Sequence, residues 1–380
     1  MGPKRICSLH WILFGAAMQN IINGVLIAGL FLFICSEAAP AQIDIKGQFW
    51  ASVYAGNDAA AGQSAYESIA GYIPTLSVGK DFGDNRLLDA EWGYRTVNTF
   101  TGGTLLSEYY QNHRLWVRYA SETLDARAGL QKIIFGPSQV LRPLSWFDTY
   151  DLTDATGQTD GVSALRLRWF RSNTSSFWGW AIWDENNYLS PGGRAEFSTR
   201  IGEWGLTIHH DPGDSVRTIG QSGVMINERH NRYAVDFRYD GLIGLWNESA
   251  LISADQSRIG MLTIGADYTL PIGSGIMVMA EAMHIDSETS LDTSSNNYSA
   301  IMAMLPIGMI HQIMYISQQD WTKNRAYNYI RWSVTYDSFS LNFILSLNPY
   351  RSEYGLASDY LPESSVGFGR GFQFMFVYNH

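Results

Sequence analysis

Apolar and polar residues alternate along one stretch after another of this chain. The first such stretch has apolar or small residues at its odd positions: Ile43, Ile45, Gly47, Phe49, Ala51 and Val53. The even positions carry the other set: Asp44, Lys46, Gln48, Trp50, Ser52 and Tyr54. Because successive side chains of a β-strand point to opposite faces, this period of two predicts a strand with one apolar and one polar face. A strand of about 9–11 residues with two such faces is the unit of a transmembrane β-barrel.

The same alternation recurs and predicts eighteen strands. Their expected ranges are 43–54, 69–80, 87–98, 112–120, 123–133, 161–171, 176–184, 194–202, 203–211, 230–240, 243–254, 259–270, 275–286, 297–305, 309–318, 327–337, 338–348 and 366–379. Sixteen strands stay open as an alternative, because the link at 255–258 is short where a long one is expected.

Short and long connections alternate between the expected strands. The short ones include Ser121-Glu122, Gly202-Glu203, Asp240-Gly241, Pro306-Ile307-Gly308 and Asp337-Ser338. The long ones lie near 55–68, 99–111, 134–160, 185–193, 212–229, 287–296, 319–326 and 349–365. This alternation predicts an all-β fold, a transmembrane antiparallel up-and-down barrel with short periplasmic turns, long extracellular loops and both mature termini in the periplasm. A soluble sandwich or propeller is the alternative, but neither needs an apolar outward face on every strand.

Composition agrees with a barrel in a membrane. Only 16% of the 380 residues are charged, against roughly 25% in soluble domains, and 14% are aromatic. After residue 34 no run of apolar residues is long enough for a spanning helix. The formal net charge of −10 argues against nucleic acid as a partner, since nucleic-acid binding needs basic patches.

The first 41 residues are expected to be a cleavable export signal, and residues 42–380 a single barrel domain. Lys4 and Arg5 precede an uncharged apolar run from Ile21 to Ile34, and Ala39-Pro40-Ala41 forms a cleavage site. The true start, Met1 or Met18, stays open, and an uncleaved anchor is the alternative. Both cysteines, Cys7 and Cys35, lie in this segment, so the remainder has no disulfide framework. Loss of Lys4, Arg5 and Glu37 turns the net charge from −10 to −11.

The last strand resembles the assembly signal of Gram-negative outer-membrane β-barrels. Aromatic residues occupy alternate positions up to the C-terminus: Phe372, Phe374, Phe376 and Tyr378. The chain ends in His380, whereas these barrels usually end in Phe.

The longest connection, 134–160, carries several charged residues: Arg142, Asp148, Asp151, Asp154 and Asp160. The neighbouring strands place arginines opposite their apolar face: Arg114, Arg118, Arg127, Arg166 and Arg168. An arginine on the lipid face at mid-membrane costs about 2–4 kcal/mol, so these five are expected to point inward.

This layout resembles porins, whose third extracellular loop folds into the barrel and faces an arginine ladder. The resemblance implies a pore constriction with the five arginines on the wall and the five loop residues opposite them, and opposed charges across a narrow pore sort ions. The alternative is that the arginines form internal salt bridges that stiffen a closed barrel.

The expected function is passive diffusion of small hydrophilic solutes through the outer membrane, with membrane lipid and the solutes as partners. The alternative is a pore-less barrel that serves as a structural or docking part of a larger complex. No catalytic residue, cofactor or metal site is expected: the chain has no G-x-S-x-G, and His209, His210 and Asp211 at a strand end are the strongest enzymatic candidates.

Methionine is concentrated in one part of the expected wall. Eight of the ten methionines after residue 41 lie between Met261 and Met314. In the strand at 275–286, Met277, Met279 and Met283 make a second apolar face opposite the lipid face. Strands that are apolar on both faces are buried on both faces. This wall is therefore expected to be a subunit interface of a homo-oligomer or to pack against an internal plug.

We predict that the mature protein begins at Gln42, because small residues follow the apolar run at a spacing that suits signal cleavage. N-terminal sequencing of protein taken from outer membranes measures this directly. An N-terminus within residues 1–38 would contradict the prediction.

Overall fold

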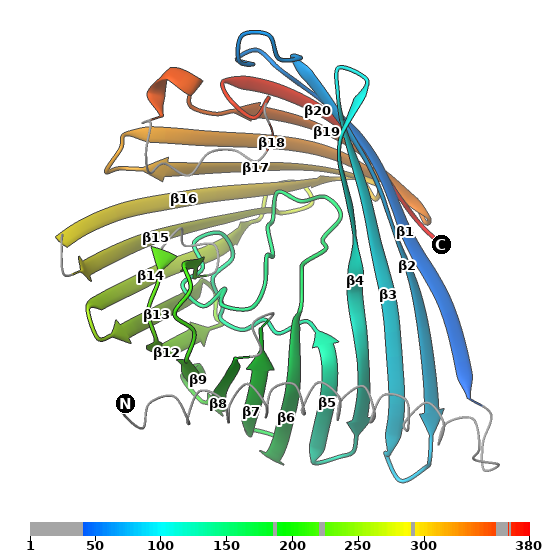
Figure 1. The fold of residues 1–380 in the computed structure, drawn as a ribbon, viewed down its shortest axis with the longest axis vertical. Coiled ribbons are helices and arrows are strands. Elements are labelled where there is room, and N and C mark those ends of the chain that lie inside the picture. Colours follow the sequence, from blue (N-terminus) through cyan, green and yellow to red (C-terminus); the bar gives the residue numbers. More distant parts are fainter. Residues whose placement is uncertain (1–40, 185–187, 220–224, 290–292, 355–363, 365) are drawn as a thin grey trace, which may run out of the picture.

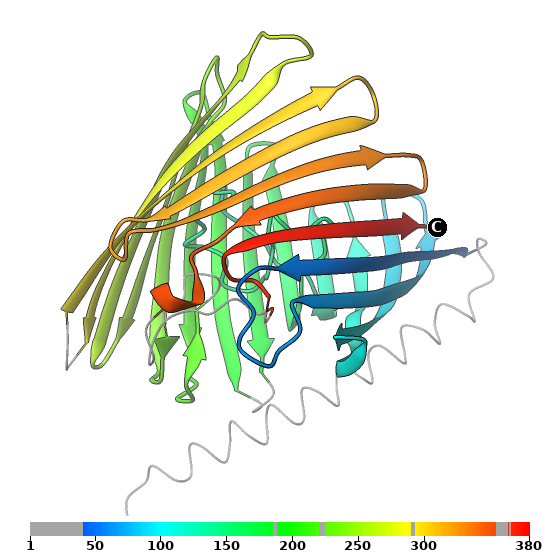
Figure 2. The same ribbon diagram turned by 90° about the horizontal axis from the view of Figure 1, so that it is seen from above.

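The computed structural model describes residues 41–184, 188–219, 225–289, 293–354, 364 and 366–380. Strands in these residues form one antiparallel sheet of eighteen strands that closes on itself (Figures 1 and 2). The strands are β1 (Gln42–Gly56), β2 (Tyr66–Asp81), β3 (Leu87–Thr101), β4 (Thr104–Ala120), β5 (Leu124–Gln131), β6 (Val162–Ser172), β7 (Ser175–Trp183), β8 (Leu189–Thr199), β9 (Gly202–Asp211), β12 (His230–Tyr239), β13 (Gly244–Ala254), β14 (Ser257–Leu270), β15 (Ile276–Thr289), β16 (Thr293–Ile307), β17 (His311–Asp320), β18 (Arg325–Thr335), β19 (Phe339–Leu347) and β20 (Arg370–Asn379). Strands β10 (Arg217–Thr218) and β11 (Met225–Ile226) pair separately, and η1 (Arg351–Glu353) is a short 3-10 helix.

Pairing of the first strand with the last closes the barrel. β1 pairs with β20 from Gln48↔Asn379 to Gly56↔Gly371, and every other barrel strand pairs with its neighbours in sequence, with β9 joined to β12. The predicted antiparallel barrel of eighteen strands is confirmed, and the alternative of sixteen is wrong. The short link at 255–256 is an ordinary tight turn between β13 and β14. Among the described residues, no helix has the length and hydropathy of a membrane span.

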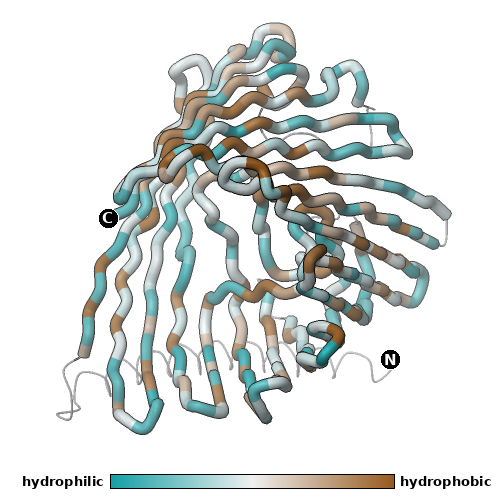
Figure 3. The backbone as a smooth tube through the Cα atoms, turned by 180° about the vertical axis from the view of Figure 1, so that it is seen from behind, coloured by the Kyte–Doolittle hydropathy of each residue, from teal (hydrophilic) through white to brown (hydrophobic). Residues whose placement is uncertain are grey.

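Hydrophobic and hydrophilic residues alternate along the strands (Figure 3), and their burial alternates as the sequence pattern predicts. On β9, Leu206 and Ile208 are 47% and 60% exposed, whereas Thr207 and His209 between them are 2% and 3% exposed. The exposed apolar side chains belong to the outer face, which is the face that meets hydrocarbon in a transmembrane barrel.

The structure corrects the expected connection at 99–111. β3 and β4 continue through most of this range and meet in a tight turn at Gly102 and Gly103, which have φ angles of 55° and 83°. Two glycines with positive φ fit the two-residue turn of a hairpin, and this signal outweighs the polar composition of the flanking residues. The connection at 319–326 is similarly shorter than expected, because β17 ends at Asp320 and β18 begins at Arg325.

The rim at this turn is uneven in height. The pairing of β4 with β5 stops at Leu115↔Leu130, although β4 begins at Thr104. Residues 104–114 of β4 therefore stand above the end of β5, and no described strand pairs with them on that side. The chain leaves the wall at the end of β5 because residues 132–161, here called the inner loop, turn into the barrel.

The interior is filled with apolar side chains on one side. The largest buried cluster joins the inner loop to strands from β6 to β16, and includes Phe135, Trp146 and Phe147 of the loop. A second cluster contains Met279, Met302 and Met314, with Val140 and Leu152 of the inner loop packed against it. The methionine wall therefore packs against an internal segment, as one of the two sequence interpretations expects. The outward face of the same strands carries other apolar residues, such as Ile264 and Ile301.

We predict that Leu167→Arg, at the centre of the outer face of β6, destabilises the barrel in a bilayer by about 2–4 kcal/mol, because the guanidinium would meet hydrocarbon. Urea titration of folding into phospholipid vesicles measures the change. Val216→Arg, at an exposed position between β9 and β10, is the control and should change stability by less than about 0.5 kcal/mol. Equal stability of both variants would show that Leu167 does not face lipid.

Candidate constriction site

The inner loop contacts walls on opposite sides of the barrel. Its first half reaches β13 and β15, where Glu248 and Glu281 accept hydrogen bonds from loop backbone N–H groups. Its second half reaches β18 and β1, where Tyr329 Oη donates to the Thr153 carbonyl at 2.8 Å and Gln48 Nε2 donates to the Thr156 carbonyl at 3.2 Å. These contacts place the loop across the lumen, as the ribbon in Figure 1 also shows.

Aromatic side chains of the inner loop form a cluster with the barrel wall. The Phe135 ring stacks on Trp180 of β7 with centroids 5.7 Å apart, and Phe147 meets the same ring edge-on at 5.9 Å. The indole of Trp180 donates to Nδ1 of His209 at 3.3 Å. This packing explains why the sequence has large apolar residues in a connection that would otherwise lie in water.

Two of the predicted constriction residues bind each other inside the loop. Arg142 Nη1 and Nη2 lie 2.6 and 3.2 Å from the two carboxylate oxygens of Asp148, and the side chains are only 3% and 1% exposed. Charged hydrogen bonds of this bidentate form are the strong kind, and each charge neutralises the other. The expectation that Asp148 faces the wall arginines is therefore wrong.

Asp151 and Asp154 stabilise turns of the loop. Each carboxylate accepts hydrogen bonds from the backbone N–H and the hydroxyl of the threonine two residues later, Thr153 and Thr156 respectively. Such turns are the usual local use of aspartate in a loop. Of the four loop aspartates, only Asp160 contacts a wall arginine among the described residues, and that arginine is Arg95, 3.2 Å away.

Three of the five predicted wall arginines pair with acidic residues of the wall itself. Arg118 lies 2.8 Å from Asp89 and 3.5 Å from Asp125, and Arg166 lies 3.0 Å from Asp125. Arg168 lies 2.7 Å from Glu196. For these three the alternative interpretation, internal salt bridges, describes the structure better than opposition to the loop.

Arg127 and Arg114 differ from the other three. Arg127 lies directly between Arg118 and Arg166 in the strand register, and its guanidinium lies over the Trp116 ring at 4.3 Å. Arg114 donates to the carbonyls of His113 and Thr159, both at 2.6 Å. Within the described residues, neither arginine has a carboxylate oxygen within 4.0 Å. The net positive charge of the predicted ladder is concentrated at these two positions.

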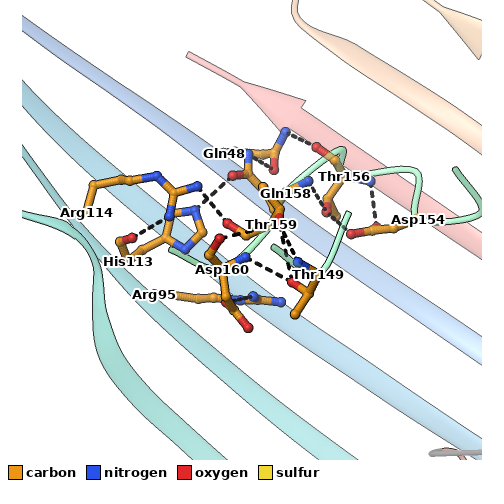
Figure 4. Close-up of polar contacts among 10 residues, drawn as sticks. All are labelled: Gln48, Arg95, His113, Arg114, Thr149, Asp154, Thr156, Gln158, Thr159 and Asp160. Carbon is orange, nitrogen blue, oxygen red and sulfur yellow. Dashed lines mark hydrogen bonds and ion pairs between the residues drawn. The ribbon is translucent and has the colours of Figure 1, made fainter. Parts of the chain in front are cut away.

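The second half of the loop meets the wall in a polar cluster (Figure 4). Gln158 bonds both Gln48 of β1, at 2.9 Å, and His113 of β4, at 3.0 Å. Arg114 holds the adjacent Thr159 carbonyl, and Arg95 pairs with Asp160. This cluster is where the loop tip and the wall come closest through hydrophilic groups, and we call it the polar contact site.

Sequence reasoning missed several residues that hold the loop: Gln48, Arg95, His113, Gln158, Glu248, Glu281 and Tyr329. The inward side of Arg95 could have been read from the alternation in β3. The partners on the loop could not, because they depend on where a long irregular segment crosses the barrel.

The two histidines among the enzymatic candidates lie on opposite faces of β9, and Asp211 pairs with Arg232 at 2.9 Å. His209 points inward and is buried, whereas His210 is exposed on the other face and bonds Asn231 at 2.8 Å. The part of the chain that the structure describes contains no group of His, Cys, Asp and Glu side chains that could hold a metal ion.

Comparison with solved structures finds bacterial outer-membrane proteins, porins among them, that match most of this chain at low identity. They include an anion-selective porin from Comamonas acidovorans (12% identity, TM-score 0.49, covering 90% of this chain and 100% of that chain), OmpF from Salmonella typhi in complex with daunomycin (11%, 0.49, 89% and 97%), and OmpT, an outer membrane protein of Vibrio cholerae, in a trimer form (8%, 0.43, 90% and 100%). No protein-family profile matches the sequence, and no curated protein matches it at a significant level. At these identities and scores, none of the properties of these proteins is transferred to this chain.

We predict that Asp148→Asn loosens the inner loop, because it leaves the buried Arg142 charge without its partner. Removing one member of a buried pair costs about 3–5 kcal/mol, whereas replacing both by apolar residues of similar volume costs far less. The rate of proteolytic cleavage within 132–161, measured on detergent-solubilised protein, should rise for Asp148→Asn. It should return toward wild type in the double variant Arg142→Met with Asp148→Leu, and equal rates in all three proteins would contradict the prediction.

Proposed function

We propose that this protein is an outer-membrane channel of the porin type for passive diffusion of small hydrophilic solutes. The observation that carries the proposal is a closed ring of eighteen strands, traced through the described residues, with charged side chains on its inner face. Side chains fill the interior of barrels of about eight strands, whereas barrels of 16–18 strands leave room for an aqueous path.

Charged side chains of the inner face are partly exposed at several points of the ring. The side chains of Arg168 on β6 and Asp267 on β14 are each 31% exposed, and that of Asp160 beside β3 is 42% exposed. Buried charges are costly unless solvated or paired, so exposed charges inside the ring support a hydrated lumen. The polar contact site, with Gln48, His113 and Gln158, lies on this hydrated route.

The orientation proposed for the barrel follows from its two rims. Gln42 and Asn379, at the ends of β1 and β20, lie at the rim that also carries turns such as 121–123, 200–201 and 336–338. The opposite rim carries the inner loop and the long connections at 212–229 and 348–369. Because outer-membrane barrels have short periplasmic turns and longer extracellular loops, we propose that both mature termini lie in the periplasm. Self-association through the outward face of β14–β17, with residues such as Ile264 and Ile301, is part of the same proposal.

A pore-less structural or docking barrel is the second candidate. The apolar clusters along β6 to β16 favour it, because they fill much of one side of the lumen together with the inner loop. In this case water would contact the charged inner face, but no continuous path for ions would cross the barrel. The two candidates differ in one measurable property, which is current through the assembled protein.

Arg127 and Arg114 favour anions over cations in the proposed channel. Their charges are not matched by a described carboxylate within ion-pair distance, whereas Arg118, Arg166 and Arg168 are matched. At the start of the inner loop, burial and then the positive charge of Arg114 lower the pKa of Lys132, which is consistent with a positive local field. Net charge of the whole chain does not set the local field of a pore.

We predict stepwise conductance of the purified protein in planar bilayers, with a reversal potential in a salt gradient on the anion side. Arg127→Gln should shift this potential toward cations, because it removes an unmatched charge from the lumen. Arg171→Gln makes the same change of charge at an exposed position near the end of β6 and should leave the potential unchanged. A folded barrel that never conducts would favour the pore-less candidate, and equal potentials for both variants would refute the role of Arg127.

A further inference from the structure

Two buried glutamates on the barrel wall have the inner loop as their main partner. Glu248 on β13 and Glu281 on β15 are 0% and 3% exposed. Among the described residues, neither has a lysine, arginine or histidine nitrogen within 4.0 Å. A carboxylate in such a place is costly unless hydrogen bonds compensate it, so these bonds determine what the two residues do.

Five backbone N–H groups of the inner loop supply the compensation. Ser138 and Leu144 donate to the two oxygens of Glu248, at 3.0 and 2.5 Å. The consecutive residues 139, 140 and 141 donate to Glu281, at 2.7, 3.0 and 2.7 Å. Trp246 adds its indole N–H to Glu281 at 3.2 Å. A buried carboxyl oxygen or N–H group left without a partner is costly, so loop and wall satisfy each other here.

The loop backbone is shaped to approach these carboxylates. Gly136 has a φ of 93°, and a Cβ atom there would overlap the Glu248 carboxylate. Pro137 precedes the donor segment and Pro143 lies within it, before Leu144; both have fixed φ angles and no N–H group. Loop and wall are therefore complementary at the level of individual N–H groups and oxygens.

Apolar packing alone does not fix the position of the inner loop along the wall. Leu141, Leu144 and Val140 pack against the clusters of the wall, but the hydrophobic effect is not directional. A small slide of the loop along the wall would keep most of that packing and break the directed bonds. The loop tip also bonds to the wall, but its contacts are spread over β1, β3, β4 and β18 and involve neutral groups or partly exposed charges, as at Tyr329, Gln48 and Asp160.

We propose that Glu248 and Glu281 are the positioning residues of the constriction: by binding residues 138–144 to β13 and β15, they determine how far residues 149–160 extend across the lumen. The proposal rests on the channel function proposed above. Neither residue touches the solute path in this scheme; both act through the loop that they hold.

The test replaces each carboxylate by the amide of equal size, Glu248→Gln and Glu281→Gln. The amide nitrogen cannot accept a hydrogen bond and faces N–H donors, so each variant loses bonds to the loop. Amide hydrogen exchange of residues 138–144, followed in detergent micelles by mass spectrometry, should accelerate roughly ten-fold, as expected when buried N–H groups lose their acceptors. Single-channel conductance should rise and fluctuate more, because the loop tip is no longer held in one place.

Glu203→Gln is the matched control. Glu203 is an exposed residue on β9, on the same strand face as Thr207, and no described contact joins it to the inner loop. It should leave exchange at 138–144 and the size and noise of the current steps unchanged. Circular dichroism and the heat-dependent electrophoretic mobility of the barrel should be the same in all variants, which separates a released loop from a damaged barrel.

Gly136→Ala tests the same contact from the loop side and decides the matter if a glutamine variant does not assemble. Its added Cβ should displace the loop from Glu248 and reproduce the effect of Glu248→Gln. Wild-type exchange in the glutamine variants and in Gly136→Ala would overturn the proposal. If exchange at 138–144 is faster in the variants but no variant or wild-type barrel conducts, the loop attachment is supported and the channel function is refuted. The two proposals can therefore be tested independently.

Discussion

The structure depends on the closure of its backbone hydrogen bonds between β1 and β20. In hydrocarbon no water is present to satisfy an open strand edge, and each unpaired N–H or C=O group costs several kcal/mol, so a sheet can span a bilayer only as a closed ring. The nine residue pairs from Gln48↔Asn379 to Gly56↔Gly371 provide that closure. Everything else in the molecule is arranged around a ring whose width is set by the number of its strands.

The wall side chains of a ring this wide cannot fill its interior. The inner loop occupies part of the space and makes apolar contacts with one side of the wall and polar contacts with the other. Along β6 to β16 the loop is part of an apolar core that includes Phe135 and Trp146. Toward β1, β3 and β4 its contacts are polar, through Gln158 and Asp160. The interior of the barrel therefore has an apolar side and a polar side, and the inner loop contacts both.

Alternation of residue types was enough to predict the barrel, its strand number and the inward side of the arginines, because a period of two determines the face of every residue in a strand. It could not predict charge pairing. Whether Arg118 meets Asp89 or a loop aspartate depends on register between strands, and a one-residue shift changes every partner. Glu248 and Glu281 were missed for a related reason: on a strand they look like ordinary inward polar residues, and their N–H partners belong to an irregular segment more than 100 positions away.

The step between β4 and β5 gives the barrel an oblique mouth. At about 3.3 Å per residue, the part of β4 above Leu115 extends roughly 35 Å along the strand beyond the top of its neighbour. The rim of the barrel is therefore high at β4 and low at β5, where the chain turns inward. In the proposed channel, a solute entering at this rim would cross the low edge first and pass obliquely over the inner loop, toward the extended part of β4 that includes Tyr109.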